Sequence, residues 1–328
     1  MVVGLSCCLA LASDLATWAD GQPAPDPVPD LAEGYRFVGP ALAAVAAKVA
    51  ERPAIARIEQ LGLSAGERPI WAVHVADPSV PVREEVLVIA GIHALEWIST
   101  EVALTWLDEL LDHPPAGTAI TVIPVLNADG RAHVEADLLE PAWGNYRRGN
   151  HLGVDLNRDY TVHRDARSWW RHVLPDYHST TEAPLSQPES RALDALLERR
   201  DYDRAASLHA FGGYLYHPWS GRWRRPDEWA AFVRQGRAME KAQGGHAYRT
   251  RQLSRWGFFF RAQGTELDHL YGAHGIEAWL IELTRSGLRP HRIAADRTTP
   301  FRWYNPVEPH PHVQRGVAAL RALARGPM

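Results

Sequence analysis

The chain contains almost no cysteine, since Cys7 and Cys8 are the only two and they are adjacent. Residues 9–328 can therefore form neither a disulfide nor a thiolate metal site. Any metal ion bound by this part of the chain must use histidine and carboxylate ligands. Sixteen histidines are available for such a site.

Lysine is also scarce, because Lys48 and Lys241 are the only two and arginine supplies the other positive charges. The net charge of −4 gives no electrostatic reason to expect binding to nucleic acid or to an anionic membrane. Beyond the N-terminus, no apolar run is long enough to span a bilayer. With 46% hydrophobic residues, the 328-residue chain is expected to form one large α/β domain or two smaller ones.

The N-terminal residues divide into an apolar segment and a proline-rich one. Residues 1–21 resemble part of a secretory signal, with Ala10-Leu11-Ala12 as a cleavage pattern, but they lack the basic start of such signals. A truncated signal would indicate a secreted or periplasmic protein, whereas a plain apolar tail would leave a cytoplasmic one as the alternative. Residues 22–37 begin with QPAPDPVPD, which predicts an extended linker. Residues 38–328 are expected to form a single domain.

Strand and helix patterns alternate along this domain. The apolar patterns predict strands at 56–63, 68–75, 86–90, 119–126, 205–209 and 278–283, the first two joined as a hairpin. Helical spacing is found at 38–50, 99–111, 189–199, 227–241 and 313–324. Residues 127–130 (NADG) predict a turn, and 250–264 a loop-rich region. The alternation favours an α/β fold with a doubly wound sheet over an α+β arrangement.

Two potential metal ligands follow a predicted buried strand, at the end where open α/β sheets place their functional groups. His93 and Glu96 lie three residues apart in GIHALEW. A helix-capping turn also explains this spacing, which recurs at His274 and Glu277 without an evident role. His209, at the end of another predicted strand, favours the metal interpretation. Two histidines and one carboxylate, with a fourth position left for water, are the ligand pattern of catalytic zinc.

Other charged residues occur where chemistry is often found. Glu282 interrupts the apolar run WLIEL, and a carboxylate in a buried strand needs either an ion-pair partner or a catalytic task. Arg147, Arg148, Asn157 and Arg158 gather in a long irregular segment, which in a compact domain is more often functional than idle. A surface arginine cluster is the alternative explanation.

Six segments occur in the order found in one enzyme family: GIHALEW, NADG, RGNHLGVDLNRDY, SQPES, SLHAFGGYLYHPW and LIELTRSG. Together they resemble the zinc metallocarboxypeptidases of the carboxypeptidase A/B and N/E superfamily, from about residue 57 to 287. The resemblance implies a mixed, doubly wound β-sheet with helices on both faces. It also implies a hydrolase with one bound zinc ion.

The resemblance assigns a role to each candidate residue at the reacting bond. His93, Glu96 and His209 match the zinc ligands, and Glu282 matches the general base that activates the zinc-bound water. That water is expected to attack the last peptide carbonyl of the substrate. Arg148 matches the arginine that stabilises the oxyanion, with Arg147 as the alternative.

The resemblance also implies how substrate is recognised. Asn157 and Arg158 match the pair that grips a free C-terminal carboxylate, a role suited to the bidentate guanidinium group. The expected partner is therefore a peptide with a free C-terminus. Leu267 matches the floor of the pocket for the terminal side chain, which favours apolar or aromatic residues. Phe260 stands where a substrate-facing tyrosine is common.

Two more residues depart from the family pattern, and two other functions stay open. Leu95 replaces an Arg or Gly between the first two ligands, and Arg285 replaces an acidic residue that commonly follows the base. A hydrolase of cell-wall peptides or N-acyl amides with the same fold is one alternative. A zinc-binding interaction protein without catalysis is the other. The sequence gives no basis for an oligomeric state.

Overall fold

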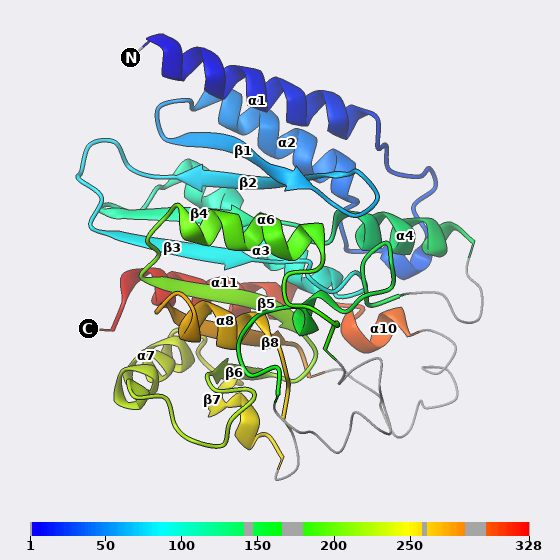
Figure 1. Ribbon diagram of the computed structural model, residues 1–328. Coiled ribbons are helices and arrows are strands. Elements are labelled where there is room, and N and C mark those ends of the chain that lie inside the picture. Colours follow the sequence, from blue (N-terminus) through cyan, green and yellow to red (C-terminus); the bar gives the residue numbers. More distant parts are fainter. Residues whose placement is uncertain (1, 141–146, 166–179, 258–260, 286–299, 328) are drawn as a thin grey trace.

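The computed structural model describes residues 2–140, 147–165, 180–257, 261–285 and 300–327, in which one sheet separates two groups of helices (Figure 1). Its eight strands have the order β1-β2-β4-β3-β5-β8-β6-β7. Their bounds are β1 Ala56–Leu63, β2 Pro69–Val75, β3 Glu84–Ile89, β4 Thr118–Ile123, β5 Arg204–Ala210, β6 Tyr214–His217, β7 Arg249–Gln252 and β8 Glu277–Leu283.

The centre of the sheet is parallel, and on each side it joins its neighbour through an antiparallel pairing, β2 with β4 and β6 with β8, while β7 pairs parallel with β6. Strands β4, β3, β5 and β8 run in one direction, so their carboxyl ends meet at one edge. The β1–β2 hairpin adds antiparallel strands beside β4, and β6 runs antiparallel to β8. This arrangement confirms the mixed α/β sheet predicted from the sequence.

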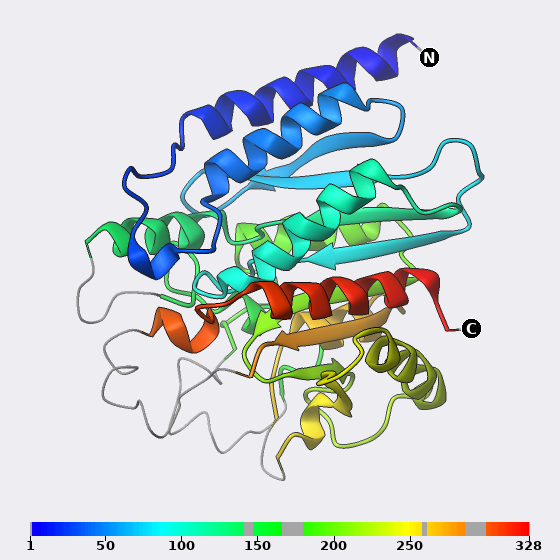
Figure 2. The ribbon, with the colours of Figure 1, turned by 180° about the vertical axis from the view of Figure 1, so that it is seen from behind.

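Helices cover both faces of the sheet. On one face lie α2 Val38–Glu51, α3 Trp97–Asp112, α7 Trp229–Ala242 and α11 His310–Arg325 (Figure 2). On the other face lie α6 Pro188–Glu198 and α8 Glu266–Gly272 (Figure 1). Two further helices, α4 Ala128–Leu139 and α10 Phe301–Tyr304, lie near the carboxyl edge of the parallel strands.

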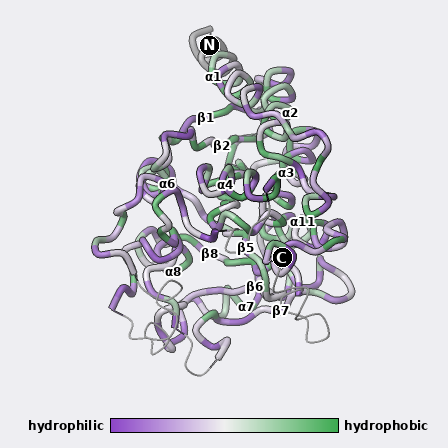
Figure 3. Tube along the Cα trace, turned by 90° about the vertical axis from the view of Figure 1, so that its right-hand side faces the viewer, coloured by the Kyte–Doolittle hydropathy of each residue, from purple (hydrophilic) through white to green (hydrophobic). Residues whose placement is uncertain are grey.

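The sheet has a hydrophobic core on each face. Side chains alternate along a strand, so Val86 and Val88 of β3 enter one core while Leu87 and Ile89 enter the other. A strand buried on both faces is apolar throughout, which explains the unbroken apolar run in the sequence. Figure 3 shows hydrophobic residues along the central strands and mostly hydrophilic residues along the outer loops.

The N-terminal residues pack on this framework. Helix α1 (Val2–Asp20) lies against α2 and β1, and its Ala12, Leu15 and Ala19 are buried in the core. Further along, Phe37 packs edge-on against Trp97, with ring centroids 5.5 Å apart. In the described part of the chain, no helix combines the length and apolarity that crossing a bilayer requires.

The predicted elements differ from the structure in a few places. The NADG sequence does not reverse the chain: Asn127 is the N-cap of α4, and its side-chain oxygen accepts a hydrogen bond from the Gly130 amide at 2.9 Å. The predicted strand at 119–126 ends at Ile123. Strands β6 and β7 and helix α8 were not predicted, and β7 includes the first residues of the expected loop-rich region.

Candidate metal centre and active site

Three parallel strands bring the candidate residues to one edge of the sheet. His93 follows β3, His209 lies in β5, and Glu282 lies in β8, directly opposite His209 in the strand register. Residues opposite each other on neighbouring strands project to the same face of a sheet. The topology therefore gathers side chains that are far apart in the sequence.

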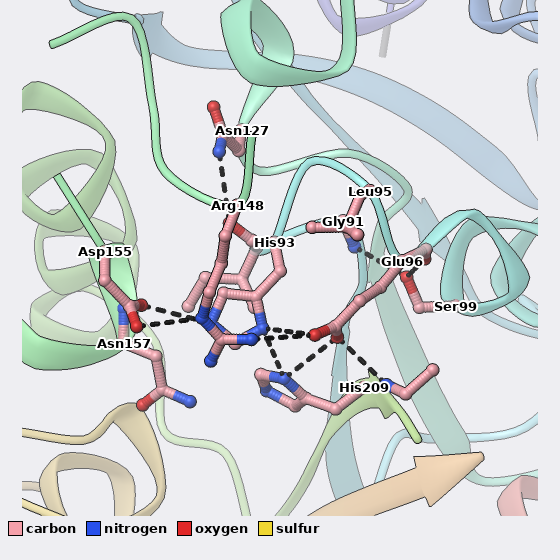
Figure 4. Close-up of polar contacts among 12 residues, drawn as sticks. Gly91, His93, Leu95, Glu96, Ser99, Asn127, Arg148, Asp155, Asn157 and His209 are labelled. Atoms are coloured by element: carbon pink, nitrogen blue, oxygen red, sulfur yellow. Dashed lines mark hydrogen bonds and ion pairs between the residues drawn. The ribbon is translucent and has the colours of Figure 1, made fainter. Parts of the chain in front are cut away.

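The turn after β3 is shaped by Gly91. Its φ of +63° lies in the left-handed region, and a Cβ atom there would stand 3.1 Å from the Cα of Val125. Asn127 supports the same turn by donating a side-chain hydrogen bond to the Ile92 carbonyl at 3.2 Å. The turn then places Glu96 at the N-cap of α3, beside His93 (Figure 4).

Three potential ligand atoms converge at this turn. The Nδ1 atom of His93 lies 2.9 Å from Glu96 Oε1 and 3.0 Å from the Nδ1 atom of His209. His209 Nδ1 is also 3.3 Å from Glu96 Oε2. Figure 4 shows the three side chains pointing toward one another, and all three are buried.

A carboxylate also lies against the outer nitrogen of each imidazole ring. His93 Nε2 is 3.1 Å from Asp155 Oδ1, and His209 Nε2 is 2.6 Å from Glu266 Oε1. Ionised carboxylates only accept hydrogen bonds, so each Nε2 carries the proton and each Nδ1 presents a lone pair. Such hydrogen bonds fix the tautomer and orientation of metal-binding histidines.

These contacts fit a bound zinc ion. Two Nδ1 lone pairs 3.0 Å apart, next to a buried carboxylate, require a positive charge between them. The donor set of two imidazoles and one carboxylate is that of catalytic zinc sites. His93, Glu96 and His209 are therefore the residues of this chain that would bind the ion.

The two candidate arginines lie in different surroundings. Arg148 reaches the centre, where its Nη1 donates to Glu96 Oε1 and its Nε to Asp155 Oδ2, each at 3.0 Å. Arg147 is exposed and donates to the His151 carbonyl at 3.4 Å. Of the two, only the Arg148 side chain borders the candidate ligands.

The charges of the centre shift the pKa of its members in opposite directions. Burial raises the pKa of Glu96, but His93 and His209 outweigh burial and hold this pKa below its ordinary value. Burial lowers the pKa of His209, but Glu266 and Glu96 raise it to about 10. The Glu96 and Glu266 carboxylates therefore favour a positive charge at the convergence point, which a metal ion or a second proton on His209 can supply.

The pKa of Glu282 shifts in the opposite direction from that of Glu96. Burial, reinforced by Glu96, raises its pKa to about 8. Its Oε2 atom is buried and has no hydrogen-bond partner in the described part of the chain. A carboxylate near the centre with a raised pKa and an unengaged oxygen is suited to proton transfer near neutral pH.

The substrate-binding candidates lie beside the centre. Asn157 and Arg158 belong to a short 3₁₀ helix, Leu156–Arg158, and both are buried. The Asn157 side-chain oxygen accepts a hydrogen bond from the Glu266 amide at 3.2 Å. Leu267 is fully buried in the core on the α6–α8 face. Phe260 lies outside the described residues.

Leu95 and Arg285, which also depart from the family pattern, both make structural contacts. Leu95 is buried in the core on the α3 face, and its carbonyl accepts a hydrogen bond from Asn305 at 2.7 Å (Figure 4 shows Leu95). Arg285 donates to the Ala247 carbonyl at 2.8 Å and passes over Gly213, where a Cβ atom would lie 2.5 Å from the Arg285 Cγ. Among the described residues, neither side chain forms a hydrogen bond or ion pair with the candidate ligands.

Sequence reasoning missed two members of the centre. Asp155 precedes Asn157 by two residues in the GVDLNRDY block, so its place in that block could have marked it. Glu266 is fully buried at the start of α8, in a region where no helix was expected. No local pattern connects Glu266 to His209, which lies 57 residues away.

Comparisons with known proteins agree with this geometry. A family model described as zinc carboxypeptidase matches residues 42–298. Carboxypeptidase O of Bos taurus is 24% identical over 235 residues, 66% of this chain and 58% of that protein. The uncharacterized protein YqgT of Bacillus subtilis (strain 168) is 27% identical over 205 residues, 54% of each chain. The chain thus spans less than two thirds of either relative.

A solved structure shares the fold. Bovine thrombin-activatable fibrinolysis inhibitor, in complex with tick carboxypeptidase inhibitor, superposes with a TM-score of 0.67 at 18% identity. The superposition covers 89% of this chain and 97% of the other.

Proposed function

Because the chain belongs to the zinc carboxypeptidase family, we propose that it removes the C-terminal residue of peptides by zinc-dependent hydrolysis. The observation that carries this proposal is the convergence of His93 Nδ1, His209 Nδ1 and the Glu96 carboxylate, with separations of 2.9–3.3 Å. One zinc ion bound by these three residues would polarise the substrate carbonyl and make a water molecule more acidic.

The side chains around the ion supply the proton transfer and the charge stabilisation. Glu282 accepts a proton from the attacking water and delivers it to the leaving amine, a task for which its raised pKa is suited. Arg148, beside Glu96, donates hydrogen bonds to the carbonyl oxygen as negative charge develops there.

Recognition of the chain end falls to Asn157 and Arg158. A buried guanidinium binds a carboxylate through two parallel hydrogen bonds, which restricts cleavage to substrates with a free C-terminus. The match of Leu267 to the pocket floor of the family favours apolar or aromatic terminal side chains, because this residue carries no charge. Glu266, the residue before Leu267, is acidic, but its buried carboxylate is directed at His209.

Replacing Glu282 by Gln tests the proposal. The variant should retain its zinc and lose 10²- to 10⁴-fold in kcat, because a positioned general base contributes that much. We would measure zinc content and release of C-terminal residues from a peptide panel, each peptide paired with its C-terminal amide. Glu277→Gln is a matched control, since Glu277 lies in the same strand and accepts a hydrogen bond from Trp279.

Four results would contradict the proposal. Full turnover by Glu282→Gln would show that Glu282 is not the general base. Equal cleavage of amidated peptides would show that Arg158 does not recognise the C-terminal carboxylate. Release of an N-acyl group without release of C-terminal residues would identify an amide hydrolase instead. Zinc binding without hydrolysis of any substrate in the panel would leave a non-catalytic zinc protein.

A further inference from the structure

A second cluster of two histidines and one carboxylate lies between α6 and the end of α8. Asp194 Oδ1 is 2.8 Å from His269 Nε2 and 3.1 Å from His274 Nε2, and these two nitrogens are 3.3 Å apart. The three atoms form a closed triangle, as the ligand atoms of His93, Glu96 and His209 do.

The size of this triangle suits a metal ion. Zinc–nitrogen and zinc–oxygen bonds of about 2.0–2.2 Å in a tetrahedron separate the ligand atoms by roughly 3.3 Å. The separations of 2.8–3.3 Å in this cluster are close to that value. They also match the 2.9–3.3 Å found at the first centre.

The tautomer of His269 can be set from outside the cluster. Its Nδ1 lies 2.8 Å from the Thr161 hydroxyl, and donation from Nδ1–H to that oxygen leaves the Nε2 lone pair directed at the cluster. Burial, together with the neighbouring His274, lowers the pKa of His269. A neutral imidazole is the form that binds metals.

The end of α8 brings the two histidines together. Residues five apart do not share a face of a continuous helix. Here the helix ends at Gly272, and Gly275 turns the chain with a φ of +70°. The His274 ring therefore comes to lie against His269, with centroids 4.8 Å apart.

The cluster is accessible from one side. The His269 side chain is 2% exposed, whereas those of Asp194 and His274 are 18% and 16% exposed. We propose that Asp194, His269 and His274 bind a second zinc ion, which links α6 to α8. A three-residue ligand set leaves a fourth position for water.

A purely structural hydrogen-bonded trio is the competing explanation. Asp194 Oδ1 can accept a hydrogen bond from Nε2–H of both histidines, in which case no ion is needed. The two explanations predict different numbers of bound zinc ions. They can therefore be separated without any measurement of hydrolysis.

Zinc stoichiometry is the test. The metal-free protein would be titrated with zinc against a chromophoric chelator, and the metal content measured after dialysis. We expect two zinc ions per chain for the wild type, and one each for His274→Ala, Asp194→Asn and His209→Ala. His113→Ala, at an exposed histidine after α3, is the matched control and should keep two.

Thermal unfolding provides a second test, in which the cluster of Asp194, His269 and His274 is first left unchanged. In His209→Ala, which lacks a ligand of the first centre, added zinc should still raise Tm by a few degrees, because an ion that binds only the folded chain stabilises it. This rise should disappear in His209→Ala/His274→Ala. One zinc ion in the wild type and none in His209→Ala would overturn the proposal and leave the first centre intact. Two ions in His274→Ala would also overturn it.

Discussion

Glu266 is the residue on which the orientation of His209 depends most directly. It is fully buried, and its Oε1 lies 2.6 Å from His209 Nε2. A charged acceptor holds the proton on Nε2 more firmly than a neutral one would. The lone pair of Nδ1 therefore stays directed at His93 and Glu96. Glu266 is a positioning residue, since its contact with the centre runs through His209.

Replacing Glu266 by Gln should weaken zinc binding about 10- to 100-fold, the usual effect of changing a residue that orients a metal ligand. The amide has nearly the same shape as the carboxylate, so the change removes charge rather than packing. Chelator competition on the metal-free protein would measure the dissociation constant. Glu277→Gln should leave it unchanged. Equal zinc affinity in Glu266→Gln and the wild type would show that Glu266 does not orient the ligand.

At the scale of elements, the β3–α3 turn depends on one glycine. Gly91 combines a positive φ with a close approach to the Val125 backbone. Gly244 also has a positive φ, +69°, but a Cβ atom there would meet nothing within 4 Å. Alanine substitutions at the two positions therefore separate the energetic cost of backbone strain from the cost of steric overlap.

Gly244→Ala should lower the free energy of unfolding by about 1–2 kcal/mol, the cost of a left-handed conformation for a residue with a Cβ. Gly91→Ala should cost more than Gly244→Ala, because its Cβ must also displace Val125, and it should weaken zinc binding by moving His93. Urea unfolding of both variants would provide the comparison. Equal losses in the two variants would mean that the turn tolerates a Cβ at residue 91.

The elements that carry a clear hydrophobic pattern are predicted well from the sequence. Strands β3, β5 and β8 and helices α2, α3 and α11 carry clear periodicity, and the structure has all of them within a few residues of the expected bounds. Strand β6 has only four residues, too few to establish a pattern. The start of α4 was taken for a turn because Asn, Asp and Gly favour both turns and helix N-termini.

The prediction of site residues was limited by distance along the chain. His274 was paired in sequence with Glu277, but the Glu277 carboxylate accepts a hydrogen bond from Trp279, and His274 contacts Asp194, 80 residues away. Contacts of this kind depend on how α6 and α8 pack, which no local spacing records. The family motifs identified His93, Glu96 and His209 as a group because they combine local patterns in a fixed order.

At the scale of the whole molecule, the stability should fall in acid because of buried neutral histidines. His217 is 2% exposed, stacks on Phe232 with centroids 5.2 Å apart, and lies with Nδ1 2.7 Å from the Pro218 carbonyl oxygen. Burial lowers its pKa to about 4, below the ordinary 6.5. The unfolded chain therefore binds this proton more readily than the folded chain.

The sign of the effect follows from proton linkage. The contribution of His217 is fully present above pH 6.5 and is lost as the pH falls toward 4, with a loss of about 2 kcal/mol between pH 7 and pH 5. Urea unfolding at several pH values would measure it. His217→Phe keeps an aromatic ring but cannot be protonated, so its stability should depend less steeply on pH. An identical slope in both proteins would contradict the assignment to His217.

The spacing of the proposed zinc ligands also governs the order of events in folding. His93 and His209 are 116 residues apart in sequence, and they meet only through the pairing of β3 with β5. Closing so long a loop costs chain entropy before any ligand pair forms, and parallel pairing between distant strands is slow. Zinc therefore cannot nucleate this fold as it does in small zinc domains. The ion can enter only after the central strands have assembled, so zinc uptake reports on a late step of folding.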